Sequence, residues 1–236
     1  MNFIFLIPPS EGKVPWWKLW EEIRSFVFEK PYEIALVATH KDLKCSGKRW
    51  EESKKLNQKN CDKYYSDKKE CLPAIERYSG VMYTALWYTH MSRDAQIYFQ
   101  DSFLICSGMY GFLKANDTIA NYKLPIETKG LVLFWREQLT HLLNTFQADI
   151  IVDFLPESYK KMIHWKDITI PVLHIDFFTQ KNETLKKMTH GVKKVKGQYI
   201  RNICERAVND IVWFPGKMRK IWEKNYQIEV IEKGLL

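Results

Sequence analysis

The chain has 236 residues, of which 46% are hydrophobic and 27% are charged, and its net charge is +8. This length suits one large domain or two small ones, and the composition is that of a globular protein rather than a disordered or fibrous one. No run of about 18 apolar residues exists, so we expect no transmembrane helix. The apolar run at residues 1–7 is too short for a signal peptide and meets two prolines.

The cysteines are odd in number and never form a Cys-x-x-Cys pair, which favours reduced thiols in a cytoplasmic protein. They are Cys45, Cys61, Cys71, Cys106 and Cys204. A zinc site built from the first three with His40 stays open as an alternative, although the spacings fit no common template. We expect no metal and no cofactor.

Charge is concentrated near the C-terminus. Residues 181–224 hold twelve Lys or Arg and four Asp or Glu, and the excess of eight equals the charge of the whole chain. A one-sided basic face favours a polyanion such as nucleic acid, whereas a solvated basic surface is the alternative.

In the first third of the chain, residues 3–7 predict a buried strand, and a loop at residues 8–13 follows it. Helical spacing of apolar residues predicts a helix over residues 16–28, and residues 32–39 predict a second strand. Residues 40–70 form a polar, lysine-rich insertion, expected to hold a long exposed helix and a mobile loop. Short helices are then expected at residues 73–78, 81–89 and 92–100, the last with Ser92 as its N-cap.

Residues 104–126 are expected to be the centre of the fold. They begin as a buried strand, turn at the glycines Gly108 and Gly111, turn again at residues 116–118 and end in extended chain. Such a segment presents backbone N–H groups at a sheet edge. The alternative is that the glycines only permit positive φ in a tight turn.

The rest of the chain alternates helices and strands. A helix with apolar face Phe134, Leu139, Leu142, Leu143 and Phe146 is expected at residues 133–146. It is followed by strands at residues 149–153, 168–177 and 185–189 and by a helix at residues 192–208. This alternation predicts an α/β (mixed α+β) fold, a single compact domain with a mixed sheet flanked by helices.

The last helix combines a buried stripe with a basic first half. Ile200, Ile203, Cys204 and Ala207 form the stripe, and we expect its lysines and Arg201 to lie outside the core. Gly197 within the helix costs about 1 kcal/mol relative to alanine. Close approach of another backbone or of a ligand explains it, and a flexible spot is the alternative.

Several stretches in one order resemble the YaaA family of bacterial peroxide-stress proteins, in the branch that begins with a Pro-Pro-Ser-Glu loop. The matching residues are 7–13, 78–86, 107–114, 117–124, 134–135, 152–153 with Tyr159, and 189–201 with Gly197. The resemblance covers roughly residues 3–208. It implies a fold particular to this family, a positively charged cleft, DNA binding, and protection of DNA from oxidative damage by keeping free iron low.

The chain departs from the family pattern at several positions. Lys114-Ala115 replaces Arg-Pro, Asn121 replaces Pro, Pro156 replaces Ser and Lys196 replaces Arg. Lysine keeps the charge of arginine but loses the planar fork that grips phosphate or carboxylate with two hydrogen bonds.

The first functional hypothesis is a DNA-binding stress protein that contacts phosphates without reading sequence. The second is an enzyme acting on a nucleobase, nucleoside or nucleotide, so that the partner is DNA or a small anionic nucleotide-like ligand, with no membrane. The candidate binding residues are Ser10, Lys13, Ser107, Gly108, Gly111, Lys114, Lys123, Lys193, Lys194, Lys196 and Arg201.

For the enzyme, polar side chains gather at predicted strand ends, where α/β sites form. They are Ser10, Ser107, Asp117, Asp153, Glu157 and Tyr159. Asp117 or Asp153 is a candidate general base or ribose ligand, and His190 is a candidate because it adjoins the basic helix. No nucleophile-with-base motif, metal triad or cofactor fingerprint accompanies them.

A third hypothesis is a redox or iron-responsive protein acting through cysteines, but Cys106 is expected to be buried and inert. The first two hypotheses expect the segments near residues 110 and 195 to meet at one anion-attracting concavity.

Overall fold

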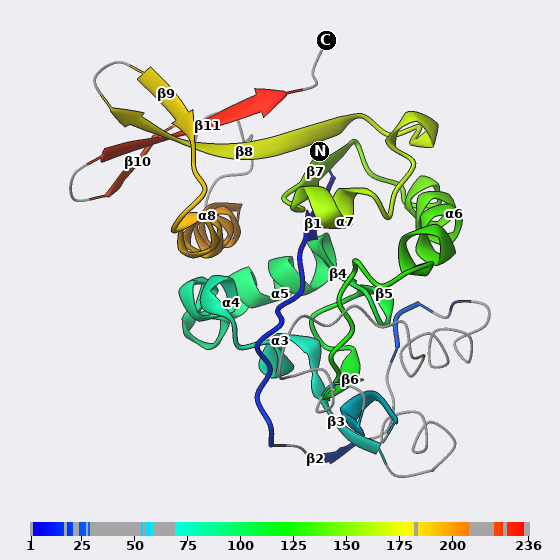
Figure 1. Cartoon of the computed structure of the whole chain (residues 1–236). Helices are drawn as coiled ribbons and strands as arrows, with labels where there is room; N and C mark the ends of the chain where they lie inside the picture. Colours follow the sequence, from blue (N-terminus) through cyan, green and yellow to red (C-terminus); the bar gives the residue numbers. More distant parts are fainter. Residues whose placement is uncertain are drawn as a thin grey trace.

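The computed structural model contains one large mixed sheet and one small sheet (Figure 1). The large sheet has the order β10-β11-β8-β7-β1-β4-β5, and β9 pairs with β8. The structure describes residues 2–16, 18–20, 24–26, 28, 53, 55–58, 69–181, 184–207, 220–223 and 226–233.

Four parallel strands form the middle of the large sheet: β1 (Phe3–Ile7), β4 (Phe103–Ser107), β7 (Ile150–Asp153) and β8 (Val172–Lys181). The runs in β4 and β7 are buried without interruption, as expected for parallel strands covered on both faces. Because these strands run the same way, Ser107, Pro8 and Asp153 follow one another along a single edge of the sheet, which we call the carboxyl edge.

Antiparallel strands extend this core on both sides: β5 (Gly111–Leu113) pairs with β4, and β9 (Thr184–Lys187), β11 (Tyr226–Lys233) and β10 (Lys220–Glu223) continue from β8. The predicted mixed sheet is confirmed, as are the strands at residues 3–7 and 149–153 and the pairing of residues 185–189 with their neighbour. The hairpin of β10 and β11 was not predicted.

Helices pack beside the sheet. They are α3 (Ala74–Arg77), α4 (Val81–Leu86), α5 (Arg93–Ser102), α6 (Leu131–Asn144), α7 (Glu157–Lys160) and α8 (Val192–Ala207), with 3-10 turns η1 (Tyr88–His90) and η2 (Trp165–Asp167). The predicted N-cap is confirmed, because Ser92 Oγ accepts a hydrogen bond from the Ala95 N–H at 3.3 Å.

Helix α8 lies against α4 and α5 (Figure 1). Its predicted stripe is confirmed at Ile200, Ile203 and Cys204, which are buried. Gly197 is where α8 approaches α4 most closely: a Cβ at this position would lie 2.2 Å from the Met82 carbonyl oxygen. Close approach of another backbone is therefore the reason for this glycine.

The predicted apolar face of helix α6 is confirmed at Leu139 and Leu143, which are buried, and its other members pack against the core. The prediction left out the residue at the centre of this face. Its fully buried aromatic residue is Trp135, whose indole Nε1 donates to the Gly108 carbonyl at 2.8 Å, while Phe134 is only partly buried. The tertiary hydrogen bond selects Trp135, since a buried indole N–H needs an acceptor.

The small sheet corrects the predicted helix over residues 16–28. Residues Lys18–Trp20 form strand β2, which pairs antiparallel with β3 (Lys69–Pro73), and β3 pairs with β6 (Thr118–Ala120). Apolar residues spaced three and four apart suit a helix in isolation, but pairing with β3 decides the conformation here.

Part of the 40–70 insertion is also corrected. Residues 53 and 55–58 are helical, as expected, and Lys55 and Gln58 are exposed, but Ser53 and Asn57 on the same helix are buried. The Asn57 side chain hydrogen-bonds both backbone groups of Lys123, donating to its carbonyl at 2.7 Å and accepting from its N–H at 3.0 Å. The strand predicted at residues 32–39 and most of the insertion lie outside the described residues. Within the described chain, no helix has the length and apolar character needed to cross a membrane.

Candidate functional site

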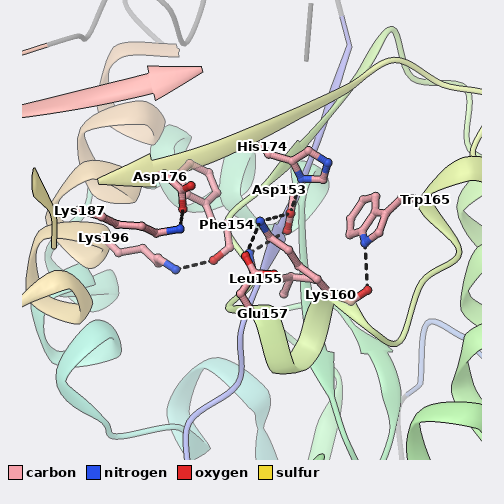
Figure 2. Close-up of polar contacts among 10 residues, drawn as sticks. All are labelled: Asp153, Phe154, Leu155, Glu157, Lys160, Trp165, His174, Asp176, Lys187 and Lys196. Atoms are coloured by element: carbon pink, nitrogen blue, oxygen red, sulfur yellow. Dashed lines mark hydrogen bonds and ion pairs between the residues drawn. The ribbon is translucent and has the colours of Figure 1, made fainter. Parts of the chain in front are cut away.

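A buried carboxylate, Asp153, stands at the carboxyl edge where β7 ends. Its Oδ1 accepts the Leu155 N–H at 2.8 Å, and its Oδ2 lies 2.7 Å from His174 Nδ1 and 3.5 Å from Lys160 Nζ (Figure 2). The backbone bond holds the carboxylate in one orientation, so that its other oxygen faces both His174 and Lys160. This grouping of Asp153, Lys160 and His174 is called the Asp153 cluster below.

His174 was not among the predicted site residues. It comes from β8, where the parallel register places it directly opposite Asp153. An ionised carboxylate can only accept hydrogen bonds, so Nδ1 of His174 carries the hydrogen and Nε2 of the neutral ring is left with a lone pair. The His174 side chain remains 31% exposed, and the Trp165 ring stands edge-on to it at 4.9 Å between centroids. A buried carboxylate that orients a histidine is the usual arrangement behind a general base or a metal ligand.

Lys196 turns toward this edge instead of toward solvent. Its ammonium donates to the Phe154 carbonyl, in the residue after Asp153 (Figure 2). Burial lowers the pKa of Lys196 to about 8, against the opposing pull of the Asp153 carboxylate. The expectation that a lysine in this part of α8 avoids the core is therefore wrong for Lys196, which lies one turn before the buried Ile200.

A chain of hydroxyl groups begins at the end of β4. Ser107 Oγ accepts the N–H groups of Met109 and Tyr110 at 3.2 and 3.1 Å, and it lies 2.8 Å from the Tyr122 hydroxyl. The Tyr122 hydroxyl lies 2.8 Å from that of Tyr78. Because both lone pairs of Ser107 are occupied, Ser107 donates its hydrogen to Tyr122. Burial raises the pKa values of both tyrosines, so both stay neutral.

Lys13 lies over this chain. Its ammonium is 4.0 Å from the Tyr122 ring centroid and 5.3 Å from that of Tyr78, and it donates to the Ser10 carbonyl at 2.9 Å. Burial lowers the pKa of Lys13 to about 7. The Ser10 side chain packs against Gly80, where a Cβ would come within 2.1 Å of the Ser10 hydroxyl oxygen. Both residues thus pack tightly at the carboxyl edge.

The backbone groups of the turn at Gly108 to Gly111 are hydrogen-bonded within the protein. The N–H groups of Met109 and Tyr110 beside it are occupied by Ser107, Gly108 accepts from Trp135, and Gly111 has φ of 66°. The alternative stated for these glycines, positive φ in a tight turn, is the one observed at Gly111. The N–H groups of Met109 and Tyr110, which lie between the two glycines, are therefore already bonded within the protein.

Both carboxylate oxygens of Asp117 also accept hydrogen bonds within the protein. The buried carboxylate accepts from the Lys114 N–H at 2.8 Å and from Ser25, through its N–H at 2.8 Å and its hydroxyl at 2.7 Å. These bonds join the chain at Ser25, which follows β2, to the turn around Lys114, so all of them serve the fold.

Four further predicted residues lie on or near α8. Lys193 and Lys194 are exposed, and His190 is exposed in the turn that precedes the helix. The Arg201 guanidinium donates to the His90 carbonyl at 3.1 Å and lies over the Trp87 ring. Helix α8 and the β4–β5 hairpin are drawn on different sides of β1 in Figure 1, and α8 contacts α4 and α5.

Cys106 is fully buried in β4, as predicted, and this burial raises the pKa of its thiol. That the thiol is inert stays a prediction. Among the described residues, no group of three or more His, Cys, Asp or Glu side chains is placed to hold a metal ion. The Glu157 side chain is exposed, and its Oε1 lies 3.4 Å from Lys160 Nζ. Burial raises the pKa of the Tyr159 hydroxyl well above its usual value.

Comparison with known proteins adds a family to this geometry. A family model described as peroxide stress protein YaaA matches residues 3–230. Among curated proteins, a UPF0246 protein of Rickettsia bellii is 25% identical over 186 residues, covering 75% of each chain. UPF0246 proteins of Legionella pneumophila and Marinomonas are similar too, at 29% over 177 residues (67% of this chain, 68% of the relative) and 28% over 190 residues (75% and 70%).

Proposed function

This chain belongs to the YaaA family of peroxide stress proteins, and from that premise we propose that it acts in the stress response by binding DNA through helix α8. The observation that carries the proposal is the charge of this helix. It holds five basic residues and one acidic residue, Glu205. Glu205 accepts hydrogen bonds from the Ser92 N–H at 3.1 Å and from the Ser92 hydroxyl at 2.9 Å. The acid is thereby occupied, which leaves the exposed surface of α8 dominated by cations.

A basic helix of this kind attracts a polyanion without reading its sequence, because phosphates are the same at every step. Lys193 and Lys194 are the best placed for phosphate contacts, since both are exposed in the first turn of α8. Lys196 adds to the positive charge of α8 but is not expected to contact a phosphate, because its ammonium donates to the Phe154 carbonyl.

Fluorescence anisotropy of labelled duplex DNA across a series of salt concentrations tests this proposal. Replacing Lys193 and Lys194 by glutamate removes two phosphate contacts, so the slope of log K against log salt becomes shallower by about 1.8. Lys129→Glu combined with Lys166→Glu makes the same charge change away from α8 and serves as the control. A wild-type slope near zero, or equal losses in both double variants, contradicts binding through α8.

A second candidate function, an enzyme acting on a nucleobase, nucleoside or nucleotide, is favoured by the Asp153 cluster. Oriented by the carboxylate, His174 Nε2 is suited to take a proton from water or a ribose hydroxyl. Incubating the protein with a panel of nucleosides and nucleotides and separating the products by chromatography tests it. Turnover that disappears in His174→Gln supports the enzyme, and turnover unchanged in that variant contradicts this site.

A further inference from the structure

The residue that ends α4 is a strained and exposed tryptophan. Trp87 adopts the left-handed conformation, with φ of 50° and ψ of 46°, and it is the one non-glycine residue with positive φ in the described part of the chain. Helices commonly end with glycine in this conformation, because a Cβ is disfavoured there. For a bulky side chain the conformation is a genuine outlier, and such outliers gather at ligand sites.

Burial of the indole does not explain the strain. Trp87 is 53% exposed and lies outside the hydrophobic core, although tryptophan has more apolar surface to bury than any other side chain. Its neighbours are polar: the His90 ring stacks on it at 4.1 Å between centroids, and the Arg201 guanidinium carbon lies 4.9 Å from its ring centroid. Arg201 is held in place by its hydrogen bond to the His90 carbonyl. We call Trp87, His90 and Arg201 the Trp87 platform.

The platform adjoins the cationic helix of the proposed function. Arg201 lies seven residues after Lys194 on α8, which is about 10 Å along the helix, or about three nucleotides at the stacked spacing of about 3.4 Å. A strand whose phosphates meet Lys193 and Lys194 would therefore have bases within reach of the indole. An aromatic ring beside a guanidinium is the combination on which unpaired bases stack.

We propose that the Trp87 platform is a stacking site for an unpaired base, so that this protein prefers single-stranded DNA, or a single-stranded stretch within a duplex, to fully paired DNA. This inference rests on the proposed DNA binding. It adds the form of the DNA and the residue that selects it. Paired bases are stacked inside the duplex and present no free face to Trp87, whereas bases in a single strand do.

Two substitutions separate a ligand role from a structural one. Trp87→Gly removes the ring and relieves the backbone strain, so the melting temperature stays equal or rises while affinity for a single-stranded thymine-rich oligonucleotide falls about tenfold. Trp87→Phe keeps a ring and retains most of that affinity. Trp16→Ala removes another exposed indole, 49% exposed, and leaves the affinity unchanged.

The measurement is anisotropy with the oligonucleotide and with its duplex, together with fluorescence of a 2-aminopurine placed in the single strand. Quenching of the 2-aminopurine by the wild type and by Trp87→Phe, but not by Trp87→Gly, is the expected result. Equal single-strand affinity in the wild type and Trp87→Gly overturns the stacking site alone, as does a fall in both melting temperature and duplex affinity. Absence of binding to either DNA by the wild type overturns the proposed function and this site with it.

Discussion

Replacing Gly197 by alanine tests the packing that brings α8 onto α4. The new Cβ would lie 2.2 Å from the Met82 carbonyl oxygen and 2.9 Å from both the Ala85 Cβ and the Leu86 nitrogen. Since contacts below 3.0 Å essentially do not occur, the helices must separate by at least 0.8 Å, the difference between 3.0 and 2.2 Å. The clash involves backbone, which has no rotamer to change.

The magnitude follows from two opposing effects. Overpacking of this kind costs about 3 kcal/mol, and alanine recovers about 1 kcal/mol of helix propensity, so Gly197→Ala lowers the free energy of unfolding by about 2 kcal/mol. For a chain of this size that is a fall of about 4–8 °C in melting temperature. Gln198→Ala, the next position on α8, is the matched control and changes stability little. A Gly197→Ala protein that melts at or above the wild-type temperature would refute close helix packing as the reason for this glycine.

Three further predictions address buried charges and thiols. Arg77→Lys lowers the free energy of unfolding by about 3 kcal/mol in urea titrations, because Arg77 is buried and donates to the carbonyls of Val14 at 2.7 Å and Trp16 at 2.8 Å; an effect no larger than that of Arg136→Lys would contradict it. Burial lowers the pKa of Lys13 to about 7 and of Lys196 to about 8, so the unfolded chain binds more protons and the urea midpoint rises with pH between about 7 and 8.5, below the range where the cysteines of the unfolded chain lose their protons; a flat or falling midpoint in this range would contradict the lowered values. Cys106 resists iodoacetamide in the native protein and reacts after unfolding, as mass spectrometry of the peptide would reveal, whereas rapid native labelling would disprove its burial.

Much of the fold was predictable because it depends on local pattern. The parallel strands β1, β4 and β7 are short unbroken apolar runs, and Ser92 precedes an amphipathic helix whose first turn it caps. Strand β2 was not predictable in this way, since its conformation comes from pairing with β3, about 50 residues away along the chain.

The candidate site was predictable in position but not in detail. A site was expected at the ends of the predicted strands, and Asp153 was chosen because it ends one of them. His174 was missed because its place opposite Asp153 depends on the register between β7 and β8, which no local pattern contains. For Lys196 a signal did exist: it lies four residues before Ile200 and therefore shares the buried stripe of α8.

The polar side chains at the carboxyl edge and those on the α4–α8 surface differ in whether they are already bonded within the protein. At the carboxyl edge, Ser107, Lys13 and Lys196 all have partners within the protein, so a ligand there would have to displace existing hydrogen bonds. On the α4–α8 surface, Lys193 remains exposed and Trp87 holds a strained conformation without burying its ring. Displacing satisfied buried groups costs more than contacting exposed ones. A large ligand such as DNA is therefore expected to bind first at α8, and loss of binding in the Lys193 and Lys194 variants should leave the Asp153 cluster and its chemistry unchanged.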